Sequence, residues 1–328
     1  MSTSSDFAHE RDFPRRVRVV EVGPRDGLQS EAGFVQTRDK IALIDGLAAA
    51  GIREFEATSF VSPRAVPQMR DAAEVIAGVD RSATNGQANA LRLTALVPNP
   101  RGATAAAGAG VDAMVVFLSA SESHNRKNVN RSREESLRGF LEVASIAREA
   151  GIAVQGAIAT AFGCPFEGEV PVGAIVDIAK GYRQLGITHV TLGDTTGMAT
   201  PPLVAERCRA LRAEVPGIEI ALHFHNTRGI GLANVYAGLH EGIDIFESAI
   251  AGLGGCPFAP GATGNIATED LVYLLEECGI ETGIDLEQVS RMARRMEEII
   301  GRTLPGQVSK AGPRLKLSQL DDVATACG

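Results

Sequence analysis

The sequence has no long apolar run and no concentration of basic residues. No stretch approaches the roughly 20 apolar residues that a membrane-spanning helix needs, so we expect no membrane partner. Residues 1–15 are polar and charged, without the apolar core of a signal peptide or an anchor. The formal net charge is −8, and no Lys/Arg-rich run is interleaved with aromatic residues. The sequence therefore argues against nucleic acid as a partner, although an acidic chain still binds phosphorylated small molecules at local sites.

Cysteine is scarce as well, with five residues among 328. They are odd in number, widely spaced and never arranged as Cys-x-x-Cys: Cys164, Cys208, Cys256, Cys278 and Cys327. This pattern predicts reduced thiols in a cytoplasmic protein, rather than a disulfide framework or a thiolate zinc site.

What the chain does have is a regular alternation of β-rich runs and helical patterns. The expected strands are Arg16–Val22, Ile52–Thr58, Leu91–Val97, Ala113–Ser119, Ala153–Ala159, Thr188–Gly193, Ile218–Phe224 and Ile243–Ile250. The expected helices between them include Arg38–Ala50, Glu134–Ala150, Val172–Leu185, Pro202–Val215 and Leu232–Glu241. Each strand–helix unit takes about 30 residues, as in a parallel βαβ unit. Eight units predict an α/β fold of the (β/α)8 TIM-barrel type, and Val22–Gly27 lacks the glycine fingerprint of an open dinucleotide-binding sheet.

The domain organisation is simple. We expect a polar N-terminal tail (1–15) and one barrel domain (16–302) that includes a short C-terminal helical extension, Thr268–Cys278 and Leu286–Ile300. Residues 303–328 are rich in proline, glycine and lysine, and we expect this tail to be mobile.

His223 and His225 stand two residues apart at the end of an apolar run, Ile218–Leu222. Because side chains in a strand alternate between its two faces, both imidazoles leave the same face and can hold one metal ion. They lie at the carboxyl end of the strand, where barrel enzymes carry their active sites. The alternative interpretation is one core histidine and one solvated histidine.

Polar residues at the other strand ends extend this candidate site. Asp26 follows the first strand and Asn265 follows the eighth, so two imidazoles, a carboxylate and an amide oxygen converge on one mouth. This mixed set suits Mg²⁺ or Mn²⁺, whereas zinc more often recruits cysteine or a third histidine. The alternatives are that Asp26 and Asn265 are turn residues.

Three further residues are candidates for catalysis. Arg25 is a permanent cation that can hold an oxyanion; the other role is a structural ion pair with Glu56 or Glu21, and the two roles are compatible. Glu56 lies in an apolar strand and can position a neighbour or transfer a proton. Cys256 lies in a glycine-rich loop without apolar periodicity, which indicates an acid or nucleophile rather than a core cysteine.

The order and length of several motifs resemble one family. They are Val20–Gln29, Thr58–Pro63 with Val66–Met69, Gly163–Gly168, Leu192–Thr195, the His-x-His pair and Ala251–Pro257. Together they resemble the 3-hydroxy-3-methylglutaryl-CoA lyases, of the DRE-TIM metallolyase family, over about Val17 to Ile300. The resemblance implies a (β/α)8 barrel, a divalent cation, cleavage of a 3-hydroxyacyl-CoA to acetyl-CoA and a keto acid, and a homodimer.

The resemblance also carries roles onto particular positions. The metal ligands fall on Asp26, His223, His225 and Asn265, and the catalytic Arg, Glu and loop Cys fall on Arg25, Glu56 and Cys256. In the chemistry that we expect, His223 or Asp26 helps to remove the hydroxyl proton, Arg25 stabilises the enolate of acetyl-CoA, and Cys256 protonates it.

The segment Ser121–Asn130, expected as a loop after the fourth strand, is the best candidate for contact with the phosphates of coenzyme A. A solvated, charge-balanced loop is the alternative. We assign substrate and coenzyme A contact to Arg25, Gln29, Ser121, Arg126, Lys127, Asn128, Asp194, Thr195 and Arg228.

Two departures from the lyase pattern bear on the substrate. The chain has Asn226-Thr-Arg228-Gly where the family has Asp-Thr-Tyr-Gly, and Gln155-Gly-Ala157 where better-known lyases have Arg-Gly-Tyr. Citramalyl-CoA, cleaved to acetyl-CoA and pyruvate, is therefore an alternative substrate to 3-hydroxy-3-methylglutaryl-CoA, which gives acetoacetate. A second alternative function is the reverse reaction, an acetyl-CoA-dependent Claisen condensation. The synthases that catalyse such condensations usually carry long C-terminal additions beyond the barrel. A barrel that only binds metal or coenzyme A would lack a ligand or the loop cysteine, and this chain has them all.

Overall fold

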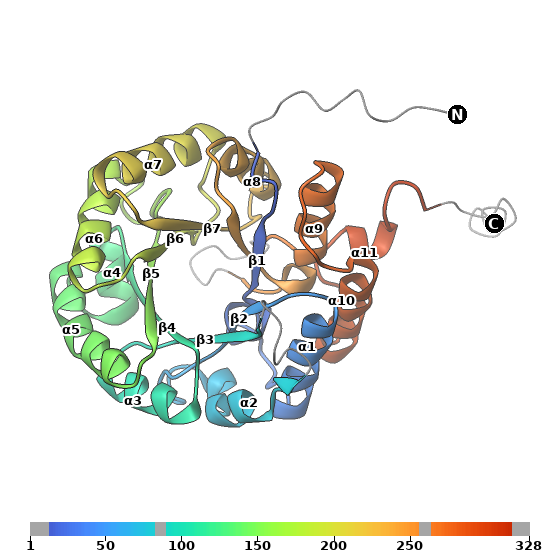
Figure 1. The fold of residues 1–328 in the computed structure, drawn as a ribbon, viewed down its shortest axis with the longest axis horizontal. Coiled ribbons are helices and arrows are strands. Elements are labelled where there is room, and N and C mark those ends of the chain that lie inside the picture. Colours follow the sequence, from blue (N-terminus) through green and yellow to red (C-terminus); the bar gives the residue numbers. More distant parts are fainter. Residues whose placement is uncertain (1–12, 83–89, 256–263, 317–328) are drawn as a thin grey trace, which may run out of the picture.

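Eight parallel strands close into a barrel in sequence order, β1 to β8, in the computed structural model, which describes residues 13–82, 90–255 and 264–316 (Figure 1). The strands are β1 Arg18–Glu21, β2 Glu54–Ser59, β3 Arg92–Leu96, β4 Ala113–Ser119, β5 Ala153–Ala159, β6 His189–Asp194, β7 Glu219–Phe224 and β8 Ile245–Ser248. Parallel pairing of β1 with β8 closes the ring. All eight strands expected from the sequence, and the TIM-barrel fold, are confirmed.

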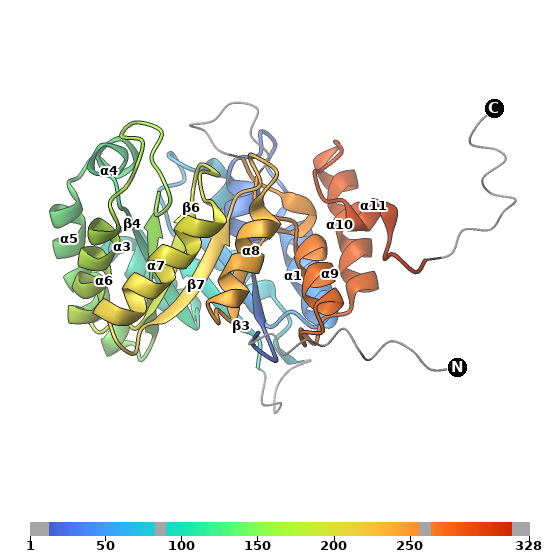
Figure 2. The same ribbon diagram turned by 90° about the horizontal axis from the view of Figure 1, so that it is seen from above.

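Helices surround the barrel and cover the outer face of its strands (Figures 1 and 2). They are α1 Thr37–Ala49, α2 Ala72–Gly78, α3 Pro100–Ala109, α4 Glu122–Val129, α5 Arg133–Glu149, α6 Val172–Gln184, α7 Pro201–Glu214 and α8 Gly231–His240. A capping box begins α5, with the Ser132 hydroxyl accepting from Glu135 N and the Glu135 carboxylate accepting from Ser132 N. It satisfies backbone donors at the start of α5 that have no partner within the helix.

The hydrophobic core lies between strands and helices. Outward-facing strand residues such as Phe55, Leu93, Ile158 and Leu222 are fully buried there. The inward-facing positions are more polar. At the amino ends of the strands, Arg18 lies 3.2 Å from Glu54 and also pairs with Glu219, so an ion-pair layer crosses that end of the barrel. Charged residues therefore occupy the interior of the barrel at the amino ends of its strands.

Beyond β8 the chain forms α9 (Thr268–Glu277), α10 (Leu286–Ile300) and α11 (Val308–Ala311), which pack beside α1 and α8 (Figure 1). Within the predicted C-terminal tail (303–328), Leu304 is buried, and Gly306 N donates to Ala251 O at 2.9 Å. The predicted mobility of residues 303–328 stays a prediction. None of the helices in the described residues is long and apolar enough to cross a membrane.

Candidate active site

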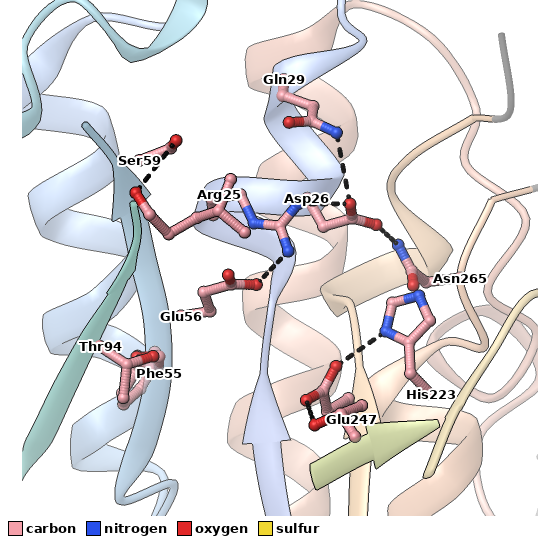
Figure 3. Close-up of polar contacts among 12 residues, drawn as sticks. Arg25, Asp26, Gln29, Phe55, Glu56, Ser59, Thr94, His223, Glu247 and Asn265 are labelled. Atoms are coloured by element: carbon pink, nitrogen blue, oxygen red, sulfur yellow. Dashed lines mark hydrogen bonds and ion pairs between the residues drawn. The ribbon is translucent and has the colours of Figure 1, made fainter. Parts of the chain in front are cut away.

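A wide helical turn after β1 places the first two site residues over the barrel. In η1 (Gly23–Gly27), the amides of Asp26 and Gly27 both donate to Val22 O, at 2.7 and 3.2 Å. Gly27 is needed because a Cβ there would lie 2.8 Å from Leu253 Cβ. The turn directs Arg25 and Asp26 toward the residues of β2 and β7 (Figure 3).

The four predicted metal ligands come together at this mouth. One ligand atom each from Asp26, His223 and His225 lies within 4.8 Å of the others. Asn265 Nδ2 donates to Asp26 Oδ2 at 2.9 Å, and the backbones of His225 and Asn265 form a β-bridge. The structure therefore brings together a turn after β1, the end of β7 and the segment after β8.

The donor set fits a divalent cation. Asn265 Oδ1 and His225 Nδ1 are buried and have no hydrogen-bond partner among the described residues. Such unpaired buried polar atoms are rare in protein interiors and mark sites where an ion or water belongs. Three carboxylates, those of Asp26, Glu56 and Glu247, interact electrostatically with Arg25. One guanidinium leaves this group with excess negative charge, which a dication neutralises.

The titration behaviour of the cluster follows from this crowding. Burial acts to raise the pKa of Asp26, but Arg25 and the histidines hold it far below its usual range. Asp26 is therefore ionised at any physiological pH, as a ligand must be. Burial lowers the pKa of His225, which favours the neutral imidazole.

Arg25 is paired on two sides. Its guanidinium donates to Asp26 Oδ1 at 2.8 Å and forms a close ion pair with Glu56 (Figure 3). Of the two structural partners that the sequence offered, Glu56 is present. Glu21 instead accepts from Gly23 N and Ile250 N at 2.7 and 2.9 Å. Burial raises the pKa of Glu56 to about 7 despite Arg25, and its Oε1 has no partner among the described residues.

Glu247 on β8 belongs to the site and was not found from the sequence. Its Oε2 lies 2.9 Å from His223 Nδ1, and its Oε1 accepts from Thr191 Oγ1 at 2.8 Å. The signal that could have found it is the period of two in Ile245-Phe-Glu247, which alternates between the two faces of a strand. Phe246 faces the helices and is fully buried, so Glu247 faces the barrel interior.

The segment assigned to coenzyme A is helical, so the prediction of a loop is wrong. Ser121 caps α4 by accepting from His124 N at 3.1 Å, and Asn130 ends it in a left-handed conformation. The helix contains too few apolar residues to show helical periodicity, which is why the pattern was missed. The side chains of Arg126, Lys127 and Asn128 are exposed, whereas Ser121 is buried.

The remaining predicted contacts lie around the mouth, where Asp194 ends β6 and where Thr195 and Arg228 stand in the loops after β6 and β7. Gln29 Nε2 lies 3.4 Å from Asp26 Oδ1. Asp194 Oδ1 accepts from Met198 N and Ala199 N, and burial raises the pKa of Asp194 to about 6. Thr195 Oγ1 accepts from Thr160 N at 2.9 Å. Arg228 donates to Thr196 O and Gly197 O at 2.9 and 2.7 Å, so it connects the loop after β7 to the loop after β6.

Cys256 lies outside the described residues, but the segment that leads to it is described. Ala251 in η4 (Ile250–Gly252) has a φ of 57°, an unusual value for a residue other than glycine. Glu21 accepts from Ile250 N at 2.9 Å, and Glu269 accepts from Ala251 N at the same distance. Two buried carboxylates thus hold the turn before the glycine-rich segment Gly252–Gly255.

The fold and these residues define a class, namely (β/α)8-barrel enzymes with a cluster of metal-ligating side chains at the carboxyl ends of the strands. Comparison with known proteins gives the family. The HMGL-like family model matches residues 16–296. The chain belongs to the HMGL-like family, and the resemblance drawn from its sequence is confirmed.

Individual relatives agree with this assignment. The chain is 43% identical to a hydroxymethylglutaryl-CoA lyase of Bacillus subtilis, over 90% of this chain and 97% of the relative. It is 43% identical to the 3-hydroxy-3-isohexenylglutaryl-CoA/hydroxymethylglutaryl-CoA lyase of Pseudomonas aeruginosa, over 92% and 98%. Among solved structures, an HMG-CoA lyase from Acinetobacter baumannii in complex with coenzyme A and 3-methylmalate has a TM-score of 0.88 at 40% identity, covering 95% and 99% of the two chains.

Proposed function

We propose that the chain is a divalent-cation-dependent carbon–carbon lyase that cleaves 3-hydroxy-3-methylglutaryl-CoA to acetyl-CoA and acetoacetate. The observation that carries the proposal is the convergence of Asp26, His223, His225 and Asn265 beside the Arg25–Glu56 pair. The names of the relatives support the substrate.

The cation is Mg²⁺ or Mn²⁺, held by Asp26, His223, His225 and Asn265, because oxygen and imidazole donors without a thiolate favour these ions. When bound, it polarises the oxygens of the acyl group.

The side chains divide the reaction between them. The proton of the 3-hydroxyl passes to a base, the C2–C3 electron pair moves to C2, and C3 becomes the ketone carbon of acetoacetate. We propose Glu56 as this base, because Oε1 is unpartnered among the described residues and its pKa of about 7 suits proton transfer. His223 and Asp26, which the sequence offered, are already engaged with Glu247 and with Arg25. They remain the alternative bases.

Arg25 then stabilises the enolate oxygen of acetyl-CoA, since burial and its carboxylate partners fix its guanidinium in place. Cys256 protonates C2 of the enolate, which completes acetyl-CoA. A chain with Cys256→Ala that kept full turnover would remove Cys256 from this scheme.

Coenzyme A approaches over α4, where Arg126, Lys127 and Asn128 are exposed. We propose that further contacts with the substrate or with coenzyme A come from Gln29, Ser121, Asp194, Thr195 and Arg228. The bound coenzyme A of the Acinetobacter baumannii lyase supports a thioester substrate. A homodimer in the cytoplasm is the proposed state, because the family resemblance implies a dimer and the cysteine pattern indicates reduced thiols.

The test is an assay of chain stripped of metal by a chelator and then loaded with Mg²⁺ or Mn²⁺. We expect acetyl-CoA and acetoacetate from 3-hydroxy-3-methylglutaryl-CoA only with added cation, and no turnover in Asn265→Ala. Faster cleavage of citramalyl-CoA would replace the substrate but keep the reaction. Release of free thiol from acetyl-CoA plus a keto acid would identify a synthase instead. Cation-independent turnover would overturn the proposal.

A further inference from the structure

Three side chains from neighbouring strands form a chain inside the barrel that ends on a proposed metal ligand. Thr191 of β6 donates its hydroxyl proton to Glu247 Oε1 at 2.8 Å, and Glu247 Oε2 lies 2.9 Å from Nδ1 of His223 on β7 (Figure 3 shows the Glu247–His223 contact). His223 and Glu247 are register partners in the sheet, so the strand pairing itself sets them side by side.

The contacts fix how the imidazole presents itself. A carboxylate has no proton to give, so His223 Nδ1 carries the proton and donates it to Glu247. In the neutral ring, the proton on Nδ1 leaves the free lone pair on the other ring nitrogen, Nε2, which lies on the Asn265 side of the ring in Figure 3. A neutral ring with one nitrogen anchored and the other available is the form in which histidine binds metals.

We propose that Glu247 is a positioning residue of the cation site, held in turn by Thr191: it orients His223 and raises the affinity of the site for a divalent cation. The inference rests on the proposed function, because it takes the cation site as given. Glu247 is not among the side chains whose ligand atoms gather within 4.8 Å of one another, which are Asp26, His223 and His225, and each of its oxygens already accepts a hydrogen bond.

The negative charge of residue 247 matters because it acts through the imidazole proton. Glutamine keeps the shape, can accept from His223 Nδ1 through its oxygen and can donate to the Thr191 hydroxyl through its amide. It lacks the charge, so Glu247→Gln holds the Nδ1 proton more weakly and leaves Nε2 a poorer metal ligand.

The barrel contains a matched control at its opposite end. There His189 of β6 and Glu219 of β7 are register partners, with Nδ1 and Oε2 2.6 Å apart. This pair has the same chemistry but lies in the ion-pair layer with Arg18, away from the proposed ligands. A Glu219→Gln variant therefore reports the structural effect of losing a glutamate–histidine contact in this barrel.

The experiment measures Mn²⁺ binding to metal-stripped full-length protein by calorimetry, together with thermal unfolding of the metal-free state. We expect Glu247→Gln to bind Mn²⁺ about 10- to 100-fold more weakly than the wild type, which is the usual loss when the hydrogen-bond partner of a ligating histidine is replaced. Its metal-free melting temperature stays near that of the wild type, and excess Mn²⁺ restores much of its turnover. Glu219→Gln keeps wild-type affinity.

An unchanged Mn²⁺ affinity in Glu247→Gln, or an equal loss in Glu219→Gln, overturns the inference. If Glu247→Gln does not fold, the same measurement is made on Thr191→Val, which removes only the hydroxyl that donates to Glu247 Oε1. A weaker Mn²⁺ affinity in Thr191→Val supports the inference. An unchanged Mn²⁺ affinity overturns it. A wild-type protein that binds no divalent cation would contradict the proposed function itself, and this result is distinguishable because every variant would share it.

Discussion

At the scale of single residues, Arg25 lies between the proposed cation ligand Asp26 and the proposed base Glu56. Its guanidinium reaches Asp26 on one side and Glu56 on the other. Lysine carries the same charge but cannot form both contacts with one planar fork. We expect Arg25→Lys to fold and to lose about 100- to 1,000-fold in kcat, the usual cost of removing one fixed donor from a charge-stabilising site. Steady-state kinetics beside a thermal melt measure both, and a kcat within threefold of wild type would show that the fork is dispensable.

Glu56 gives a prediction about pH. A base must be deprotonated to act, so kcat rises with pH through the pKa of Glu56 and then levels off. That pKa is about 7 without a cation, and a bound dication lowers it further, so the rising limb lies at or below pH 7. In Glu56→Gln we expect a large loss of turnover, and the residual activity lacks this limb. A limb that persists in Glu56→Gln assigns the base to His223, because Asp26 is already ionised throughout this pH range.

Glu21 predicts a change in stability with pH. Burial raises its pKa to about 7 from the usual 4.5, so the native state holds this proton more tightly than the unfolded chain. The stability from protonated Glu21 is therefore complete below pH 4.5 and is lost as pH rises through 7, amounting to roughly 3 kcal/mol. Other buried acids titrate too, so the informative quantity is the difference between the denaturant-unfolding free energies of wild type and Glu21→Gln. We expect this difference to change between pH 5 and 8; a constant difference would mean that Glu21 stays ionised.

Residue types at strand ends were enough to predict that Asp26, His223, His225 and Asn265 lie together, because parallel strands in a barrel place their carboxyl ends at one mouth. They were not enough for Glu247. Whether an acid in a strand pairs with a neighbour depends on the register between β7 and β8, which a single sequence does not encode locally. The partner of Arg25 was likewise left open between Glu56 and Glu21, and only the placement of Gly23 and Ile250 amides around Glu21 decides it.

At the scale of elements, the segment after β8 packs closely against the proposed ligand Asn265. Gly254 has a φ of 115°, and a Cβ there would lie 2.8 Å from Asn265 Nδ2. We expect Gly254→Ala to displace Asn265 and weaken Mn²⁺ binding severalfold. Gly279→Ala is the control, since Gly279 also has a positive φ of 74° but faces open space, so it carries backbone strain of about 1 kcal/mol without touching the site. Equal Mn²⁺ affinities in the two variants would contradict this role of Gly254.

Helix α4 shows where element prediction from sequence reaches its limit. Its ends are set by the local capping contacts of Ser121 and Asn130. Between them the helix has no apolar face, so periodicity does not predict it. By contrast α5 has both a capping box and an apolar stripe, and it was predicted. Periodicity finds helices that pack with one face on a core, and a polar helix at the mouth of a barrel has no such pattern.

At the scale of the whole molecule, residues 303–311 fasten the C-terminal helices to the barrel. Leu304 is buried, Gly306 N donates to Ala251 O, and Asp270 accepts from Gln307 N and Val308 N. A chain ending at Arg302 loses these contacts, including a buried leucine worth about 2 kcal/mol. We expect its melting temperature to lie several degrees below that of a chain ending at Lys316. Identical melting of the two truncated chains would show that the segment contributes nothing.

The hydrogen bond between Asp26 and Asn265 joins residues 239 positions apart. As a result, neither the N-terminal half nor the C-terminal half of the barrel contains all the residues of the site. A polypeptide cut between α5 and β5 would leave Arg25, Asp26 and Glu56 on one fragment and His223, His225, Glu247 and Asn265 on the other. Catalysis by such a mixture would therefore report reassociation of the fragments, so this enzyme can serve as its own complementation reporter for the way half-barrels recognise each other.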